Sequence, residues 1–415
     1  MISNEYRLSY HECRDLLAKR LSEPAPGRIQ LLSGPRQVGK TTLLLELAEG
    51  LEGQTVYAAA DAPEAALPGF WERMFVKAEE IAADQEKAVI FLDEAHLLQD
   101  WAAKLKSYFD RYRRKKTPIH IVATGSSALR LFSGSRETLA GRFERLTLTH
   151  WSASSFSQVL DIEEIEAAEF VVRKGSYPGA YQYRDDLARW SAYVRDAILE
   201  PAIGRDILAL SSIRRPALLR QVFGIAASSP TQILSLQKIQ GQLQDRGALE
   251  TIANYLRLLE EAYLVAPVMK YAERETRRRS SPPKLVVLNN ALVAIADSDG
   301  ASEIDKDPRR LGTWIENACL AHAWNAGQRL YYWREEPLEA DGIIEGSWGK
   351  WAIEVKSGKY QIADLKGLLE FVRRHPKFRP LVICVKENVN AAKRAGIDSI
   401  TWQEFLLKGP PGLSA

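Results

Sequence analysis

The sequence predicts an α/β protein that is built from several domains. At 415 residues the chain is too long for a single hydrophobic core, and about two or three domains are expected. Near the N-terminus an apolar strand leads into a glycine-bearing turn and a helix, and further apolar strands follow before residue 150. Near the C-terminus a helix, three strands, a helix and a strand follow one another. Strands that alternate with helices are typical of α/β domains.

The composition restricts the class of protein. A hydrophobic content of 46% and a charged content of 26% are ordinary for a globular chain. The net charge is only +3, so any affinity for nucleic acid has to come from local basic patches. Cys13, Cys319 and Cys384 are far apart, which argues against a disulfide framework or a zinc site and for a reducing compartment. Without a signal peptide or a run of about 18 apolar residues, we expect a cytoplasmic protein with no membrane span.

The first motif lies in residues 28–50, RIQLLSGPRQVGKTTLLLELAEG. It fits GxxxxGK[ST], in which backbone N–H groups surround phosphate oxygens at a helix N-terminus. Lys40 is expected to reach the β- and γ-phosphates, and Thr41 is expected to hold magnesium. An ordinary helix N-terminus with a chance lysine is the alternative, and the strand–turn–helix context argues against it. The predicted ligands are ATP and Mg²⁺, and the predicted binding residues are Gly34, Pro35, Arg36, Gln37, Val38, Gly39, Lys40, Thr41 and Thr42.

A second apolar strand, AVIFLD, ends in Asp93 and is followed by Glu94. Asp93 is expected to contact magnesium beside the phosphates, and Glu94 to orient and activate the attacking water. A helix N-cap with a favourable dipole contact is the structural alternative. The motif comes 53 residues after Lys40, with the strand TVYAAA between them. This order of elements is the one expected of AAA-like P-loop enzymes.

Two more candidates follow from that order. The strand IHIVATG leads to Ser126, which we expect to contact the γ-phosphate or the water, although AAA enzymes often have asparagine there. Arg142 follows the next predicted helix, where AAA enzymes place the arginine finger that reaches a neighbouring subunit's ATP; Arg145 is the reserve candidate. A surface ion pair at a helix C-terminus is the alternative for Arg142. The finger interpretation predicts self-association into a ring, with a hexamer expected.

The middle of the chain is predicted to be mainly helical. A turn is expected at Tyr177, Pro178 and Gly179. Three apolar-periodic helices, a strand, a hairpin tip and a returning strand then follow, which is the pattern of a winged helix. Arginines at the hairpin tip suit contact with DNA phosphates, whereas a solvated loop or a protein-binding winged helix is the alternative. The candidate DNA-binding residues are Arg274, Arg277, Arg278 and Arg279.

The C-terminal elements have the order of the restriction-endonuclease-like, or PD-(D/E)XK, fold. Its catalytic signature is an acid on the first helix, an aspartate on one strand, and Glu-X-Lys on the next strand. The candidates here are Glu316, Asp341, Glu354 and Lys356.

The chemistry of a nuclease explains these residue types. Asp341, Glu354 and a backbone carbonyl could hold magnesium, which activates water and polarises a phosphodiester, while Lys356 positions the water or stabilises charge. Because side chains alternate along a strand, we expect Asp341, Glu354 and Lys356 to share one exposed face. A salt-bridged strand surface and a nuclease-derived domain that binds DNA without cutting it are the alternatives.

The chain resembles the bacterial and archaeal AAA-type ATPases that carry a C-terminal restriction-endonuclease-like domain long listed as of unknown function. The resemblance runs nearly end to end and rests on GPRQVGKTT, FLDEAHLL, TGSS, LAGRF, SYPGAY, GTWIENACL, EADGIIEG and AIEVKSG. One departure is Asn289-Asn290, where relatives usually have an acidic residue and glycine. The expected domains are an AAA-type core at 1–150, a helical lid at 151–210, a winged helix at 211–284 and a nuclease-like domain at 285–415.

The resemblance implies ATP hydrolysis and a role on DNA, with branched intermediates such as Holliday junctions as the expected substrates. The first functional hypothesis is therefore a magnesium-dependent motor whose C-terminal domain binds or cuts branched DNA. The competing hypothesis is an ATP-driven regulatory switch in which the same C-terminal domains hold protein partners.

Overall fold

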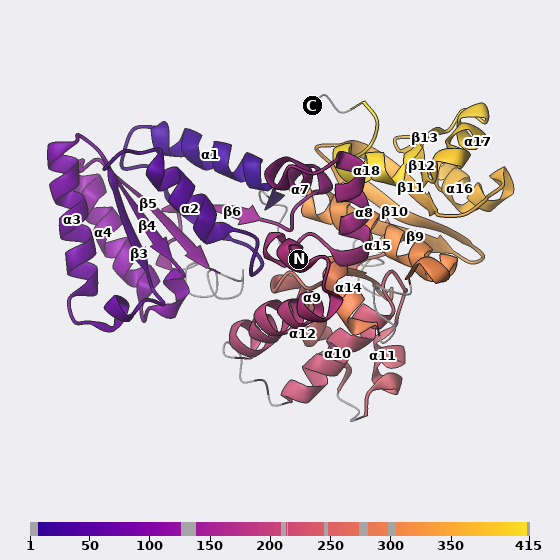
Figure 1. The fold of residues 1–415 in the computed structure, drawn as a ribbon, viewed down its shortest axis with the longest axis horizontal. Coiled ribbons are helices and arrows are strands. Elements are labelled where there is room, and N and C mark those ends of the chain that lie inside the picture. The colour runs from indigo at the N-terminus through magenta and orange to yellow at the C-terminus, as the bar shows by residue number, and fades with distance from the viewer. Residues whose placement is uncertain are drawn as a thin grey trace. The chain divides into compact units, whose positions relative to one another are not determined.

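The computed structural model describes residues 7–125, 138–208, 213, 215–244, 248–273, 281–297 and 304–412. The chain divides into two compact units, Met1–Thr149 and His150–Ala415. Figure 1 shows the elements of both units. Among the residues described, none of the helices combines the length and the apolar character that crossing a membrane requires.

Unit 1 contains a six-stranded parallel sheet with the order β1-β6-β2-β5-β4-β3. Every residue of β2, β4 and β5 is buried, as expected for central strands of a parallel sheet that is covered on both faces. Strand β5 lies between β2 and β4. The strands are β1 (Arg7–Leu8), β2 (Ile29–Ser33), β3 (Thr55–Ala59), β4 (Ala88–Asp93), β5 (Ile119–Gly125) and β6 (Phe143–Leu148).

Helices cover both faces of this sheet. Helices α3 and α4 lie on one face and α2 on the other (Figure 1). The ring of Phe75 stacks on that of Tyr108 and joins α3 to α4. The helices are α1 (Tyr10–Ser22), α2 (Lys40–Glu49), α3 (Phe70–Asp84) and α4 (Trp101–Lys115), with 3₁₀ turns at Pro63–Ala66 and Ala95–Leu97.

The first half of unit 2 is helical. A 3₁₀ turn, Pro178–Tyr183, begins at the turn predicted from Tyr177, Pro178 and Gly179. The helices before and after it are α7 (Ala153–Leu160), α8 (Glu164–Lys174) and α9 (Leu187–Tyr193), followed by π-helical turns at Val194–Leu199 and Ala202–Ile207.

Three helices and an antiparallel strand pair come next, in the predicted order. An isolated bridge from Ile233 to Lys284 adds a third segment beside the pair. The four candidate arginines, Arg274, Arg277, Arg278 and Arg279, lie outside the described residues. The elements are α10 (Pro216–Ser228), α11 (Leu236–Gln242), α12 (Leu249–Glu261), β7 (Val265–Val268), β8 (Lys284–Val287) and then α14 (Asn290–Ala296).

The second half of unit 2 contains a five-stranded mixed sheet with the order β13-β12-β11-β10-β9. Strands β9, β10 and β11 are antiparallel, and β11, β12 and β13 are parallel. The predicted order of helix, three strands, helix and strand is present, and α17, β13 and α18 extend it. The elements are α15 (Pro308–Asn325), β9 (Arg329–Glu335), β10 (Leu338–Gly346), β11 (Gly349–Lys356), α16 (Lys366–Arg374), β12 (Arg379–Cys384), α17 (Val389–Arg394), β13 (Asp398–Thr401) and α18 (Trp402–Lys408).

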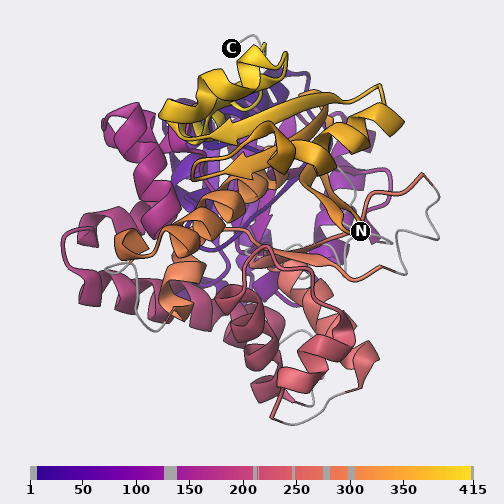
Figure 2. The same cartoon turned by 90° about the vertical axis from the view of Figure 1, so that its right-hand side faces the viewer.

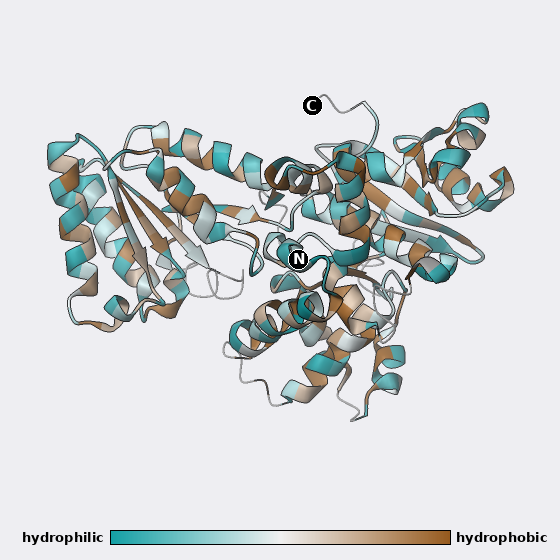
Figure 3. Cartoon of the chain, in the orientation of Figure 1, coloured by the Kyte–Doolittle hydropathy of each residue, from teal (hydrophilic) through white to brown (hydrophobic). Residues whose placement is uncertain are grey.

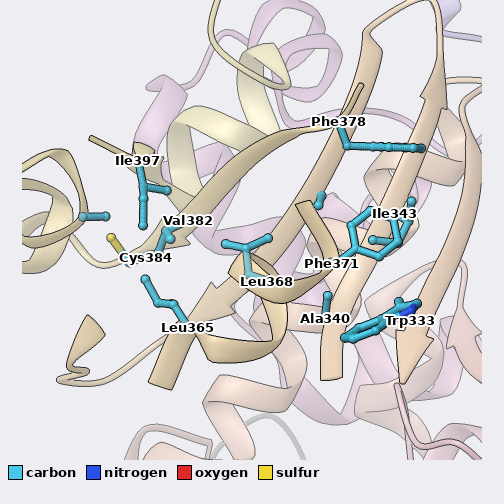
Figure 4. Close-up of a cluster of buried hydrophobic side chains, with 12 residues drawn as sticks. Trp333, Ala340, Ile343, Leu365, Leu368, Phe371, Phe378, Val382, Cys384 and Ile397 are labelled. Atoms are coloured by element: carbon cyan, nitrogen blue, oxygen red, sulfur yellow. The ribbon is translucent and has the colours of Figure 1, made fainter. Parts of the chain in front are cut away.

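Helices α15 and α16 both pack against β10 and β11 of this sheet (Figure 2). On the α16 side, Trp333, Ile343, Leu368 and Phe371 belong to a closely packed apolar cluster (Figure 4). Helix α16 approaches β10 so closely that a Cβ added to Gly367 would lie 1.8 Å from the carbonyl oxygen of Glu339. Hydrophobic and hydrophilic stretches alternate along the helices (Figure 3), as expected when one helix face is buried.

Asn289 and Asn290 have structural roles. The Asn289 side chain caps α14 by accepting from Ala291 N, and it also accepts from Ser176 N. The amide of Asn290 donates to the carbonyl oxygens of Val172 and Trp314. These hydrogen bonds of Asn289 and Asn290 hold α14 in place.

His150 makes unit 2 sensitive to acid. Its Nε2 contacts the carbonyl oxygen of Tyr263 at 2.9 Å, and the amide of Asn289 donates to its Nδ1 at 3.1 Å. Burial lowers the pKa of His150 to about 4. A proton on Nδ1 would face the donor amide of Asn289, so folding favours the neutral ring. The unfolded chain binds that proton below about pH 6.5. The contribution of the neutral His150 ring to the free energy of unfolding is therefore fully present above pH 6.5 and is lost as the pH falls towards 4.

We expect acidification from pH 7 to pH 5 to reduce the stability of unit 2 by about 2 kcal/mol through His150 alone. The measurement is chemical denaturation of wild-type protein and a His150→Gln variant at both pH values. The variant should be less stable than wild type at pH 7, but its free energy of unfolding should fall less between pH 7 and pH 5. An equal loss in both proteins would contradict the assignment to His150.

Candidate functional site

The turn between β2 and α2 has the shape of a phosphate-binding loop. A Cβ added to Gly34 would lie 2.1 Å from the carbonyl oxygen of Leu148, so only glycine lets the loop pass β6. Gly39 has a φ of 88° at the N-cap of α2, a conformation that favours glycine. The N-terminal N–H groups of α2, which begins at Lys40, lie at the end of this loop, the arrangement that binds anions.

Lys40 is buried against this loop. Its Nζ donates to the carbonyl oxygen of Pro35 at 2.8 Å and to that of Gly34 at 3.1 Å. The ammonium is thus held over the same turn whose N–H groups would bind phosphate. The binding of phosphate by Gly34 and Lys40 stays a prediction.

Asp93, at the end of β4, is a buried carboxylate that accepts hydrogen bonds from three side-chain hydroxyl groups. Its Oδ2 accepts from Thr41 Oγ1 at 2.6 Å and from Tyr57 OH at 3.0 Å, while its Oδ1 accepts from Thr124 Oγ1. Burial, and then the charge of Asp93, raise the pKa of Tyr57, so the phenol remains a donor. A hydroxyl and a carboxylate are the oxygen ligands that magnesium prefers. Thr41 and Asp93 therefore fit the predicted magnesium site.

Glu94 has an unusual backbone conformation. Its φ of 50° lies in the left-handed region, which residues other than glycine seldom adopt. Its N–H donates to Thr124 Oγ1 at 3.0 Å and to Asp93 Oδ1 at 3.1 Å, and these bonds stabilise the conformation. Its Oε2 lies 3.3 Å from Nδ1 of His96. Strained residues of this kind cluster at functional sites, in agreement with a catalytic role for Glu94.

Thr124, on β5, contributes a hydroxyl group to the contacts around Asp93 and Glu94. Ser126, the residue predicted to contact the γ-phosphate or the water, lies outside the described residues. Thr124 contacts both Asp93 and Glu94, and Tyr57 approaches Asp93 from β3. These two contributions were not predicted, because they depend on which strands are neighbours. The available signals were the tyrosine within TVYAAA and the threonine near the end of IHIVATG.

Arg142 lies directly before β6 and forms a two-point ion pair with Asp110 of α4. Its Nε donates to Oδ1 at 2.7 Å and its Nη2 to Oδ2 at 3.0 Å. The hydrogen bond from Arg142 holds the pKa of Asp110 below its usual value. A surface ion pair, which was the alternative interpretation of Arg142, is present, and the arginine-finger role stays a prediction. Arg145, the reserve candidate, lies on β6 with its guanidinium 5.4 Å from the centre of the Phe143 ring.

The four nuclease-like candidates come together in unit 2, around a lysine that sequence reasoning missed. Lys284 on β8 places its Nζ 2.8 Å from Glu316 Oε1 and 3.6 Å from Asp341 Oδ1. Glu339 Oε1 lies 3.5 Å from the same nitrogen. Lys356 Nζ donates to Glu354 Oε1 at 2.7 Å, 2 residues back along β11.

The expected exposed face is wrong for Glu354, which is only 6% exposed. Alternation places Glu354 and Lys356 on one side of β11, but helices pack against both β10 and β11 and cover the middle of the strand. Burial, and then the charge of Asp341, raise the pKa of Glu354 to about 8. Burial also raises the pKa of Glu316 to about 7. Burial alone would lower the pKa of Lys284, but the charges of Glu316 and Asp341 raise it above its ordinary value.

The carboxylates of Glu316, Asp341 and Glu354, together with Lys284, form an acidic centre. This centre does not fit the predicted metal. Among the described residues there is no group of three or more histidine, cysteine, aspartate or glutamate side chains arranged to hold a metal ion. The Lys284 ammonium lies between Glu316 and Asp341, and Asp341 Oδ2 accepts from Val355 N at 2.8 Å. The Lys284 ammonium and the Val355 N–H therefore already occupy the carboxylate of Asp341, one of the ligands expected for magnesium.

Three protein-family models match consecutive parts of the chain. Residues 26–157 match the family model of an AAA domain. Residues 165–303 and 311–405 match two domains of unknown function, DUF8612 and DUF4143. The chain is 26% identical, over 355 residues, to the uncharacterized proteins Rv2008c of Mycobacterium tuberculosis and Mb2031c of Mycobacterium bovis. In each case the match covers 83% of this chain and 74% of the relative.

Comparison with solved structures finds three further similarities, each at low sequence identity. The Walker-type ATPase PABY2304 of Pyrococcus abyssi is 14% identical with a TM-score of 0.44, covering 69% of this chain and 95% of its own. The RuvB Holliday junction branch migration motor of Thermotoga maritima is 18% identical with a TM-score of 0.32, covering 62% and 87%. AMPPCP-bound DnaA of Aquifex aeolicus is 12% identical with a TM-score of 0.32, covering 60% and 86%. Together with the phosphate-binding loop and the Thr41–Asp93 pair, the family match shows that residues 26–157 form an AAA-type P-loop ATPase domain.

Proposed function

We propose that the protein is a magnesium-dependent ATPase that uses ATP hydrolysis to move along or remodel DNA, with branched duplexes such as Holliday junctions as its substrates. The observation that carries the ATPase part is the contact network of Thr41, Asp93, Thr124 and Glu94 beside the phosphate-binding loop. Each of these groups lies on a different element, α2, β4, β5 or the turn after β4, and the parallel sheet brings them to one edge.

The residues of this site have different roles in phosphoryl transfer. Lys40 exchanges its bonds to the loop carbonyls for bonds to phosphate oxygens, and the N–H groups at the start of α2 bind the same anion. Thr41 and Asp93 would hold magnesium, which when bound neutralises charge on the phosphates. Glu94 orients the attacking water and accepts its proton, and Thr124 keeps the Glu94 backbone in place.

The DNA part of the proposal rests on unit 2. The three helices α10, α11 and α12, followed by the antiparallel pair β7 and β8, have the element order of a winged helix. The connection between β7 and β8 contains the four candidate arginines, and cations there would contact phosphates without reading sequence. In this proposal the C-terminal sheet domain binds DNA without cutting it, because its acidic centre does not fit a catalytic metal.

The test is the ATPase rate of the full-length chain without nucleic acid and with duplex, single-stranded, forked and four-way DNA. We expect DNA to raise the rate several-fold, most with four-way DNA. Changing Arg277, Arg278 and Arg279 together to serine should remove the stimulation and leave the basal rate unchanged. A matched control changes Arg113 and Arg114, at the basic end of α4, and should keep the stimulation. Turnover that is indifferent to every nucleic acid would contradict the motor and favour the regulatory switch with protein partners.

A further inference from the structure

The side chain of Lys284 is enclosed by oxygen atoms from two other elements. Its Nζ contacts Glu316 Oε1 on α15 at 2.8 Å and donates to the backbone carbonyl oxygen of Asp341 on β10 at 3.2 Å. Carboxylate oxygens of Asp341 and Glu339 lie 3.6 and 3.5 Å away, and the lysine side chain is 2% exposed. A buried ammonium needs such partners, and buried carboxylates equally need a cation.

These oxygen atoms include ones that a divalent cation would use. Glu316 and Asp341 are two of the predicted catalytic acids, and carboxylates with a backbone carbonyl are typical oxygen ligands of Mg²⁺ and Mn²⁺. The third acid, Glu354, is also buried, and its Oε2 is a buried oxygen without a hydrogen-bond partner in the described part of the chain. Oε1 of the same carboxylate is bound by Lys356 at 2.7 Å. The centre thus holds an acceptor that its present partners leave unsatisfied.

We propose that Lys284 is a built-in cation that takes the place of a divalent metal in the C-terminal domain. The ammonium binds Glu316 and Asp341, joins β8 to α15 and β10, and excludes the metal from the centre. The domain is therefore metal-independent and does not cleave phosphodiesters. Removing the ammonium leaves the carboxylates of Glu316 and Asp341 and the backbone carbonyl of Asp341 without their cation, and Mn²⁺ can bind these oxygen atoms instead. The inference does not depend on the ATPase proposal, since it concerns unit 2 and is tested without nucleotide.

The experiment counts Mn²⁺ ions bound to the nucleotide-free, full-length protein by electron paramagnetic resonance. Wild-type protein and an Asp341→Asn variant should bind the same number, because the centre binds no metal while Lys284 is present. Lys284→Met, which removes the charge and keeps much of the length, should bind one more ion than wild type. Adding Asp341→Asn to that variant should remove the extra ion. Lys350→Met is the matched control, because Lys350 pairs with Glu345 on the same sheet at 2.8 Å but at its surface.

Stability gives a second readout. Lys284→Met should lower the melting temperature in the absence of metal, and Mn²⁺ should recover part of that loss; the wild type and Lys350→Met should show no such recovery. A wild-type protein that binds one Mn²⁺ more than Asp341→Asn would overturn the proposal. A folded Lys284→Met protein that gains no ion would overturn it as well. If Lys284→Met does not fold, the comparison of wild type with Asp341→Asn still tests whether the centre of the wild-type protein binds a metal ion.

Discussion

Replacing Glu94 with glutamine is expected to leave ATP binding intact and to lower the hydrolysis rate by about 10²–10⁴-fold, the usual effect of losing a positioned general base. Glutamine keeps the size of the side chain but cannot accept a proton from the attacking water. The backbone bonds from Glu94 N to Thr124 and Asp93 do not involve the changed atoms, so the local fold should persist. ATP affinity by calorimetry and turnover by phosphate release measure the two effects separately.

Lys40→Ala is the companion variant and should behave differently. Lys40 contacts phosphate already in the bound ground state, so its loss should weaken ATP binding itself. Glu49→Gln, an exposed position on α2, serves as the control and should match wild type in both measurements. If Lys40→Ala and Glu94→Gln lost binding to the same extent, the division of roles between phosphate contact and water activation would be wrong.

The nucleotide site could be predicted because its signals are local in the sequence. Gly34, Gly39 and Lys40 lie within one turn, and the loop's geometry needs glycine at the first two positions. The partners of Asp93 could not be predicted in the same way. Tyr57 and Thr124 come from strands on either side of β4, and only the order of strands in the sheet brings their hydroxyl groups to one carboxylate.

The contacts in the acidic centre of unit 2 also depend on elements that are far apart in the sequence, and they were harder to predict. Element order placed Glu316, Asp341, Glu354 and Lys356 in one group, and the structure brings them together. Lys284 precedes Glu316 by 32 residues, on a strand that sequence reasoning assigned to the winged helix. Strand alternation describes which residues share a side of β11, but burial depends on the helices that pack there. The motif therefore could not predict that Lys284 balances the charge of the carboxylates in the centre.

Arg142→Ala is expected to reduce ATP turnover by about 10³-fold or more, the effect typical of an arginine that contacts the transferred phosphate from a neighbouring subunit. In the single chain its guanidinium is bound to Asp110. A finger would leave that carboxylate for the neighbour's ATP, so Asp110→Ala should keep or raise the turnover. If the ion pair served only the stability of unit 1, both variants would lose activity to the same degree, since either change removes the whole pair. The comparison of the two variants thus separates a catalytic arginine from a structural one.

Mixing variants tests whether Arg142 acts between subunits. An Arg142→Ala subunit keeps an intact phosphate-binding loop, and a Lys40→Ala subunit keeps an intact arginine, so an interface between them can hold one complete site. We expect each variant to be inactive alone and the mixture to regain part of the wild-type rate, with ring assemblies, expected to be hexamers, seen by sedimentation. A strictly monomeric protein with full ATPase activity would rule out this role. Activity that never returns on mixing, in subunits shown to co-assemble, would instead confine Arg142 to its pair with Asp110.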